Sequence, residues 1–217
     1  MIMKLFGLYN KHKNKHSLIL LILILSPVVW SLLFQPISVI SEVVKAPQYI
    51  KTNISSIFAS SNLRHVEEMR WNAFGEEKNE LLSTIFYNKV GVLFNKFFDL
   101  FSMLSPRLFF QSGDGTQFSP TGIEPVASVL IIFWFLGIYQ LLKQKKYKTL
   151  YLIPVAALPA FVAGQRNIVF LFPLLILYLH IVIVGMRDSL KKIKSKNRVI
   201  VILLIYGLFI IGRWLLL

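Results

Sequence analysis

Two residues that could do chemistry, Arg107 and Asp114, lie close together in the stretch SPRLFFQSGDGTQFSPTGIEP, residues 105–125. A guanidinium such as that of Arg107 can bind a phosphate through two parallel hydrogen bonds. The carboxylate of Asp114 can accept hydrogen bonds from sugar hydroxyls or hold a divalent cation. The same stretch also suits a tight connector, because its prolines discourage helix and SGDG is typical of turns. On residue types alone, a substrate-facing loop and a simple turn both remain open.

The second candidate is the tetrapeptide GQRN, residues 164–167, between two long apolar stretches. Such a short turn would hold Arg166 at the level of the lipid headgroups, where its guanidinium can bind a phosphate. Gln165 and Asn167 would add neutral polar contacts. The alternative is an interfacial arginine that only extends towards lipid headgroups.

Other polar residues give weaker signals. His65 with Glu67 and Glu68 suggests a metal, but these types fit a solvated helix face better, and no metal site is predicted. Asn53 begins an NIS triplet, a glycosylation pattern that is common by chance. His180 falls within an apolar stretch, where it would face other helices or form a hydrogen bond across them.

Several kinds of chemistry are excluded by the sequence. It contains no cysteine, so disulfides and cysteine-based metal sites are ruled out. It also has no phosphate-binding loop, no G-x-S-x-G and no H-E-x-x-H pattern. No carboxylate lies within the long apolar stretches, which argues against a proton- or cation-coupled transporter.

Composition indicates a membrane protein. Hydrophobic residues make up 55% of the chain and charged residues 16%, against about a quarter in soluble domains. Mean hydropathy is +0.63. Five apolar stretches approach the roughly 20 residues that a membrane-crossing helix needs; they are residues 17–34, 125–142, 147–164, 167–186 and 199–217. The predicted fold is therefore all-α, with five transmembrane helices.

The distribution of positive charge predicts the orientation in the membrane. Residues 1–16, 143–148 and 187–198 contain 14 of the 24 basic residues and a single acidic residue. Because basic segments stay on the cytoplasmic side, we expect these three there. Residues 35–124 contain eight basic and nine acidic residues and are expected outside. The net charge of +14 is thus an insertion signal of a cytoplasmic (inner) membrane protein, and a nucleic-acid partner is not predicted.

The external segment has three predicted parts. Residues 35–80 are mixed and polar and suggest short helices and loops. Residues 81–104 place most polar side chains on one helical stripe beside Phe, Leu and Ile, which predicts an amphipathic helix. This helix would lie on the outer membrane face or pack within a small external domain. The loop 105–124 then leads into a four-helix membrane region, residues 125–217.

A family resemblance follows from these motifs. NKVGVLFNKFFDLFSMLSPRLFFQSGD, followed by a Pro/Gly loop and VASVLIIFWFLGIYQLLKQKK, resembles the C-terminal half of GT-C class membrane glycosyltransferases. The relevant type is the bacterial set related to protein mannosyltransferases and to the aminoarabinose transferase of lipid A. The matching residues are Asn88, Lys89, Ser105, Pro106, Leu108, Phe109, Gly113, Asp114, Leu136 and Gly137. Arg166 also matches the external turn of the family, and Gln165 stands where the family often has a His.

The resemblance implies transfer of a sugar from a polyprenyl-phosphate donor to an acceptor on the outer face of the membrane. The catalytic carboxylates of the family belong to an N-terminal half that this chain does not contain. We therefore expect a C-terminal portion, inactive alone, whose partners are membrane lipid, the donor and a missing half or companion chain. The nominated substrate or lipid-phosphate contacts are Arg107, Asp114, Gln165 and Arg166, and no catalytic residue is assigned.

Two further expectations accompany this reading. No cofactor is predicted within this chain, although a divalent cation is compatible with the complete family fold. The alternative function is a non-enzymatic membrane scaffold or assembly subunit of a cell-envelope complex. In that case the external helix would dock a partner and the loop would be only a connector.

Overall fold

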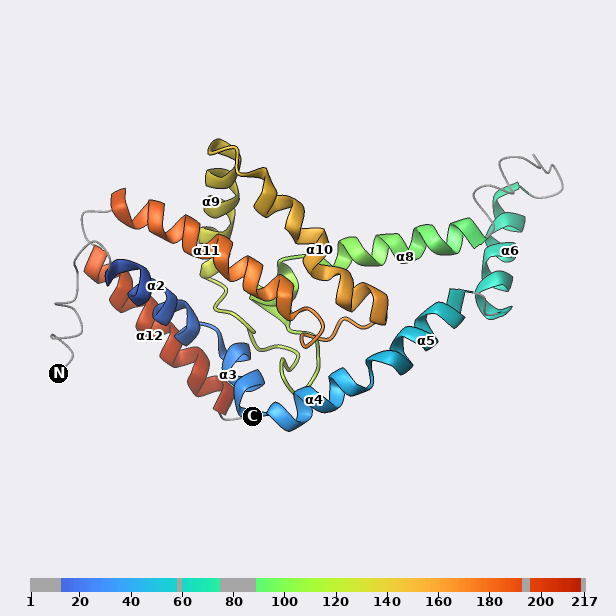
Figure 1. Cartoon of the computed structure of the whole chain (residues 1–217), viewed down its shortest axis with the longest axis horizontal. Helices are drawn as coiled ribbons and strands as arrows, with labels where there is room; N and C mark the ends of the chain where they lie inside the picture. Colours follow the sequence, from blue (N-terminus) through green and yellow to red (C-terminus); the bar gives the residue numbers. More distant parts are fainter. Residues whose placement is uncertain (1–12, 58–59, 75–88, 193–195, 216–217) are drawn as a thin grey trace.

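The computed structural model of the chain describes residues 13–57, 60–74, 89–192 and 196–215. This described part consists of helices, connecting loops and one isolated β-bridge, so the all-α prediction is confirmed for it (Figure 1). In chain order the helices are α2 (Lys13–Ile24), α3 (Pro27–Phe34), α4 (Pro36–Val44), α5 (Ala46–Ile57), α6 (Ser60–Phe74), α8 (Lys89–Met103), the π-helical turn η1 (Leu108–Ser112), α9 (Leu130–Lys143), α10 (Tyr147–Ala163), α11 (Phe172–Lys192) and α12 (Lys196–Leu215).

The first predicted transmembrane helix is broken into α2 and α3. Pro27 lacks an N–H group and starts α3 instead of continuing α2. Backbone groups exposed by the break bond to the segment before α9. Ala127 N donates to Leu25 O at 2.8 Å, and Val28 N donates to Pro125 O at 3.1 Å. Backbone hydrogen bonds to a distant part of the chain therefore replace the helical hydrogen bonds that are lost at the break.

The loop that follows α8 contributes to the core. Phe109, Phe110 and Phe118 have at most 1% of their surface exposed. The ring of Phe109 lies 5.2 Å from that of Tyr178 on α11, which in turn lies 5.2 Å from Trp134 on α9. The hydroxyl of Tyr178 donates to the backbone oxygen of Leu104, the residue that follows α8. Residues 105–124 are thus anchored by aromatic packing, which a simple surface connector would lack.

Two glycines bring α9 and α11 together. A methyl group at Gly185 would overlap the backbone oxygen of Phe133, and one at Gly137 would overlap that of Ile181. Each glycine thus lies directly against the backbone of the opposite helix. Small residues allow such a close helix crossing.

The segment predicted to be external is more helical than the sequence suggested. Helices α4, α5 and α6 follow one another with few intervening residues where short helices and loops were expected. The predicted amphipathic helix 81–104 corresponds to α8, and its first residues, 81–88, lie outside the described residues. Phe94, Phe97, Phe98 and Phe101 form an exposed aromatic face along α8.

Helix length and apolar composition identify candidate membrane-crossing helices. Among the described residues, Phe172–Leu190 is long and apolar enough to cross a membrane. The bent pair α3–α4 would be a second span if counted as one unit, and α9, α10 and part of α12 are shorter apolar helices. Figure 1 shows α2, α10 and α12 running from upper left to lower right, α11 running from lower right to upper left, and α9 running upward. The five membrane crossings and their order stay a prediction.

Candidate functional site

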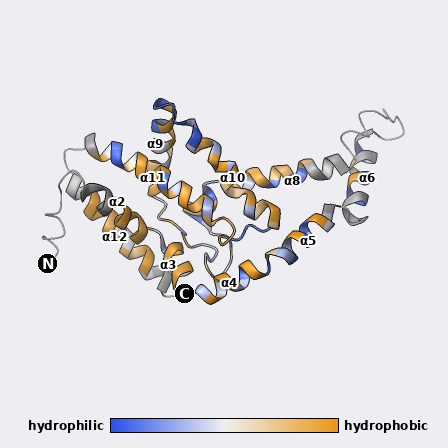
Figure 2. Cartoon of the chain, in the orientation of Figure 1, coloured by the Kyte–Doolittle hydropathy of each residue, from blue (hydrophilic) through white to orange (hydrophobic). Residues whose placement is uncertain are grey.

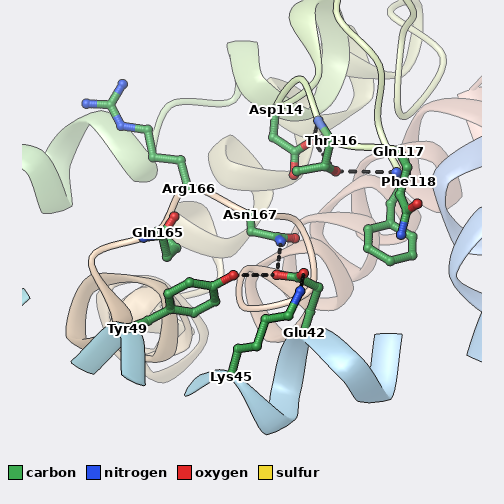
Figure 3. A pocket seen from close by; sticks show the side chains of 10 residues that line it. All are labelled: Glu42, Lys45, Tyr49, Asp114, Thr116, Gln117, Phe118, Gln165, Arg166 and Asn167. Carbon is green, nitrogen blue, oxygen red and sulfur yellow. Dashed lines mark hydrogen bonds and ion pairs between the residues drawn. The ribbon is translucent and has the colours of Figure 1, made fainter. Parts of the chain in front are cut away.

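A pocket of about 680 Å³ lies where three separate segments meet. The first is the α4–α5 region, the second is the tip of the loop before α9, and the third is the α10–α11 connection (Figure 3). Polar side chains dominate its lining, which consists of Glu42, Lys45, Tyr49, Asp114, Thr116, Gln117, Phe118, Gln165, Arg166 and Asn167.

Three of the four nominated contacts line this one pocket. Asp114 comes from the loop, and Gln165 and Arg166 come from the connection about 50 residues later. Arg107 does not line it; this residue is exposed and immediately precedes η1. The structure therefore brings together the two motifs chosen from the sequence, but leaves Arg107 outside the pocket.

Asp114 fastens the loop to the α10–α11 connection. One carboxylate oxygen, Oδ1, accepts hydrogen bonds from the backbone N of Thr116 at 2.9 Å and from its hydroxyl at 2.7 Å. The other oxygen, Oδ2, accepts from the backbone N of Ile168. Burial raises the pKa of Asp114 above its ordinary value, and the hydrogen bonds from Thr116 and Ile168 oppose this shift. The turn interpretation of this aspartate is thus correct at the level of geometry, and the carboxylate still borders the pocket.

The turn before Asp114 depends on a glycine. Gly113 has φ +64°, and a side chain there would collide with the backbone oxygens of Ser119 and Pro120. Only glycine combines this left-handed backbone with so little room. Gly113 therefore lets the chain turn back and place the carboxylate of Asp114 at the pocket.

Glu42 organises the opposite wall of the pocket. Its carboxylate accepts hydrogen bonds from Lys45 Nζ at 2.9 Å, Tyr49 Oη at 3.2 Å and Asn167 Nδ2 at 3.2 Å. The hydrogen bond to Glu42 raises the pKa of Lys45 above its ordinary value. Asn167 also accepts from Val169 N at 2.9 Å, which fixes its orientation. Glu42 and Asn167 thus connect α4 to the α10–α11 connection across the pocket.

Arg166 is only loosely held. Its Nη2 lies 3.6 Å from Asp99 Oδ1, and both side chains are about half exposed, so solvent screens this pair. Figure 3 shows the guanidinium directed away from the Glu42–Asn167 contact. A smaller hollow of about 90 Å³ on that side is lined by Arg166, Asp99, Lys96 and Asn53, among others. A ligand in the larger pocket would therefore compete with a weak ion pair for this arginine.

Asn53 has a structural role that accounts for its position. Its Nδ2 donates to the backbone oxygens of Phe161 and Val162, each at 3.1 Å, near the end of α10. Its Oδ1 accepts from Lys96 Nζ at 2.8 Å. Because the amide bonds to the chain itself, the NIS triplet needs no glycan to explain it.

The remaining sequence candidates lie apart from the pocket. His65, Glu67 and Glu68 are exposed on α6, as expected of a solvated face. His180 is exposed on α11, so the expectation that it faces other helices is not met. Within the part of the chain that the structure describes, no three His, Asp or Glu residues group closely enough to hold a metal ion.

Motif reasoning missed the Glu42 wall. Glu42, Lys45 and Tyr49 belong to the segment 35–80, which was expected to form short helices and loops and in which no binding residue was nominated. One signal was present, because Ile37, Ile40 and Val44 recur at helical spacing with Glu42 on the other face. Their meeting with Asn167, 125 residues later, is set by tertiary structure alone.

Comparison of the chain with protein-family models, with curated proteins and with solved structures finds no match.

Proposed function

We propose that this chain is the C-terminal membrane portion of a glycosyltransferase that uses a polyprenyl-phosphate sugar. In this proposal the pocket binds the head of the lipid-linked donor. The observation that carries the proposal is the meeting of Asp114, Gln165 and Arg166 in one polar pocket with Glu42 and Lys45. Phosphate and sugar recognition need a cation and several hydrogen-bonding groups, and this lining contains both.

Exposed apolar side chains support a membrane location for the helices. Each of α9, α10, α11 and α12 carries large apolar side chains that are at least one-third exposed. They include Phe135, Leu152, Ile176, Ile205 and Phe209. In water such extensive apolar exposure would be unfavourable, whereas lipid covers it. We therefore propose a multi-pass protein of the cytoplasmic membrane, with the pocket on the external side.

The types of the pocket residues suggest which of them would bind the phosphate of the donor and which would bind its sugar. Arg166, released from Asp99, would bind the phosphate through its forked donors. Glu42, Asp114 and Gln117 offer oxygens to sugar hydroxyls, and Lys45 adds a second cation. The lipid tail would leave along the exposed apolar surfaces of the neighbouring helices.

In a transfer of this kind, an acceptor oxygen bonds to the anomeric carbon of the sugar as the bond from that carbon to the phosphate oxygen breaks. The acceptor loses its proton to a base, and the polyprenyl phosphate departs with the electron pair of the broken bond. Arg166 would stabilise the negative charge of that departing phosphate. Glu42 and Asp114 are already engaged in hydrogen bonds and are proposed as binding groups, so the base is not assigned to this chain.

Direct binding tests this proposal. The purified protein in lipid nanodiscs is titrated with a short-chain polyprenyl-phosphate sugar and, as a matched ligand, with the free polyprenol of the same length. We expect saturable binding of the phosphate sugar at least about tenfold tighter than of the polyprenol, because a charged hydrogen-bonded contact contributes about 1.5–3 kcal/mol. Equal affinities would reject recognition of the phosphate sugar.

The scaffold alternative has one observation in its favour. Both oxygens of Asp114 accept hydrogen bonds from the chain, which is the arrangement of a structural fastening. A scaffold would show no saturable donor binding in the same titration. The two functions are therefore separated by one experiment.

A further inference from the structure

Helix α4 has two chemically different faces. Ile37, Ile40 and Val44 are 83%, 62% and 71% exposed. At 100° per residue they fall within about 60° of one another around the helix. Glu42 lies on the other side and contacts Asn167 across the pocket. One short helix thus presents an apolar stripe outward and a pocket wall inward.

The apolar surface of α4 continues onto α3 around a sharp corner. The two helix axes differ by 83°, with Gln35 at the junction. Leu33 and Phe34, at the end of α3, are 63% and 76% exposed. Figure 2 shows hydrophobic residues on both sides of the bend between α3 and α4. With nine residues, α4 is about 14 Å long and too short to cross the hydrocarbon core.

We propose that α4 lies in the plane of the outer membrane surface, with Ile37, Ile40 and Val44 in the lipid and Glu42 facing the pocket. The inference rests on the membrane location proposed above. A helix that crosses the membrane and one that lies on its surface meet at about a right angle, as α3 and α4 do. Apolar contact with the acyl-chain boundary stabilises such a helix.

The corner also favours lipid over a protein as the occupant of this surface. A protein partner bound to the stripe of α4 would leave Leu33 and Phe34 uncovered, because the proposed topology places these two residues in the lipid. The bilayer surface covers both sides of the corner without a break. The same placement puts the Glu42 wall, two residues from Ile40, at headgroup level. The pocket would therefore receive the head of a molecule whose tail stays in the membrane.

Depth-dependent quenching tests this placement. The chain has no cysteine, so single-cysteine variants can be labelled with a fluorophore without removing native residues. Ile40→Cys reports on α4, Ile205→Cys on the exposed middle of α12, and Glu67→Cys on the polar surface of α6. Each variant is placed in nanodiscs with nitroxide lipids labelled near the headgroup or at the chain end. Aqueous iodide is the third quencher.

The label at Ile40 is expected to be quenched by the headgroup nitroxide at least about twofold more than by the chain-end nitroxide or by iodide. The label at Ile205 should respond most to the chain-end nitroxide, and the label at Glu67 to iodide. If the label at position 40 is quenched by iodide alone, or by none of the three quenchers, the placement of α4 is overturned. If neither nitroxide lipid quenches the label at position 205, the membrane location of the helices is rejected instead. Failure of the α4 placement and failure of the membrane location therefore give different results.

Discussion

Asp114 both stabilises a turn and lines the pocket. Its bonds to Thr116 and Ile168 join the loop to the connection that carries Arg166. Sequence patterns predicted a turn at SGDG and a phosphate contact at GQRN separately. They could not identify the hydrogen bond between the two, because contacts over 54 residues depend on how the whole chain packs.

Replacing Asp114 with Asn should destabilise this junction. The amide retains one acceptor for Thr116 but directs an NH₂ group at the backbone N–H of Ile168. We expect the free energy of unfolding at neutral pH to fall by about 1–3 kcal/mol. Chemical unfolding in detergent measures this change, and an unchanged value would show that the junction contributes nothing.

The same variant tests the pH dependence of stability. Burial raises the pKa of Asp114, so the folded chain binds this proton more tightly than the unfolded chain does. The free energy of unfolding should therefore decrease as the pH rises from below the ordinary pKa of about 3.9 through the raised value. Asp114→Asn should lose this part of the pH profile. An identical slope in the variant would refute the assignment.

Asn53 offers a second residue-level test. In Asn53→Asp, an oxygen replaces the NH₂ group that donates to Phe161 and Val162. We expect a loss of about 1–3 kcal/mol, because two carbonyl groups lose their donor. Asn72→Asp, on the exposed surface of α6, is the matched control and should change stability little. Equal effects of the two variants would contradict the role given to Asn53.

At the scale of the helices, the hydrophobic runs predicted where helices occur better than where each helix begins and ends. The apolar run 17–34 predicted one helix, but Pro27 divides it because residues 125–127 bond to the backbone groups at the break. Prolines 154 and 159, in contrast, lie inside the continuous α10. Sequence alone could not distinguish these cases, since the outcome depends on whether a distant segment supplies hydrogen bonds.

The α9–α11 crossing makes a prediction at the same scale. Gly185→Ala should push the two helices apart, because the added methyl group overlaps the backbone of Phe133. We expect a loss of about 1–3 kcal/mol in stability. Gly212→Ala on α12 is the control, since nothing lies within 4 Å of the added group. Thermal unfolding in detergent compares the stability of the two variants. An unchanged stability of Gly185→Ala would exclude a tight crossing of α9 and α11.

For the whole molecule, the orientation in the membrane stays a prediction from the pattern of positive charge. Lysines follow α9, whereas the pocket lies at the other end of α10. Of the site, sequence reasoning found Asp114, Gln165 and Arg166 but missed Glu42, Lys45 and Tyr49. Types and spacing identify groups within a short motif, while the pocket is assembled from three separate segments.

Cysteine labelling in intact cells tests the orientation. Gln117→Cys at the loop tip should react with a membrane-impermeant maleimide added outside, because the pocket is proposed to be external. Gln144→Cys, in the connection between α9 and α10, should react only after the membrane is permeabilised. Both positions are exposed, so access to the reagent decides the result. The reverse pattern would invert the proposed topology.

The central claim is that the pocket bordered by Arg166 binds the phosphate of a lipid-linked sugar. Its most direct test compares Arg166→Ala with Arg107→Ala, an exposed arginine outside the pocket. The measurement is the affinity of each protein for the polyprenyl-phosphate sugar in nanodiscs. We expect Arg166→Ala to weaken binding by about tenfold or more, and Arg107→Ala to bind as the unchanged protein does. Unchanged affinity of Arg166→Ala, or equal losses in both variants, would contradict the claim.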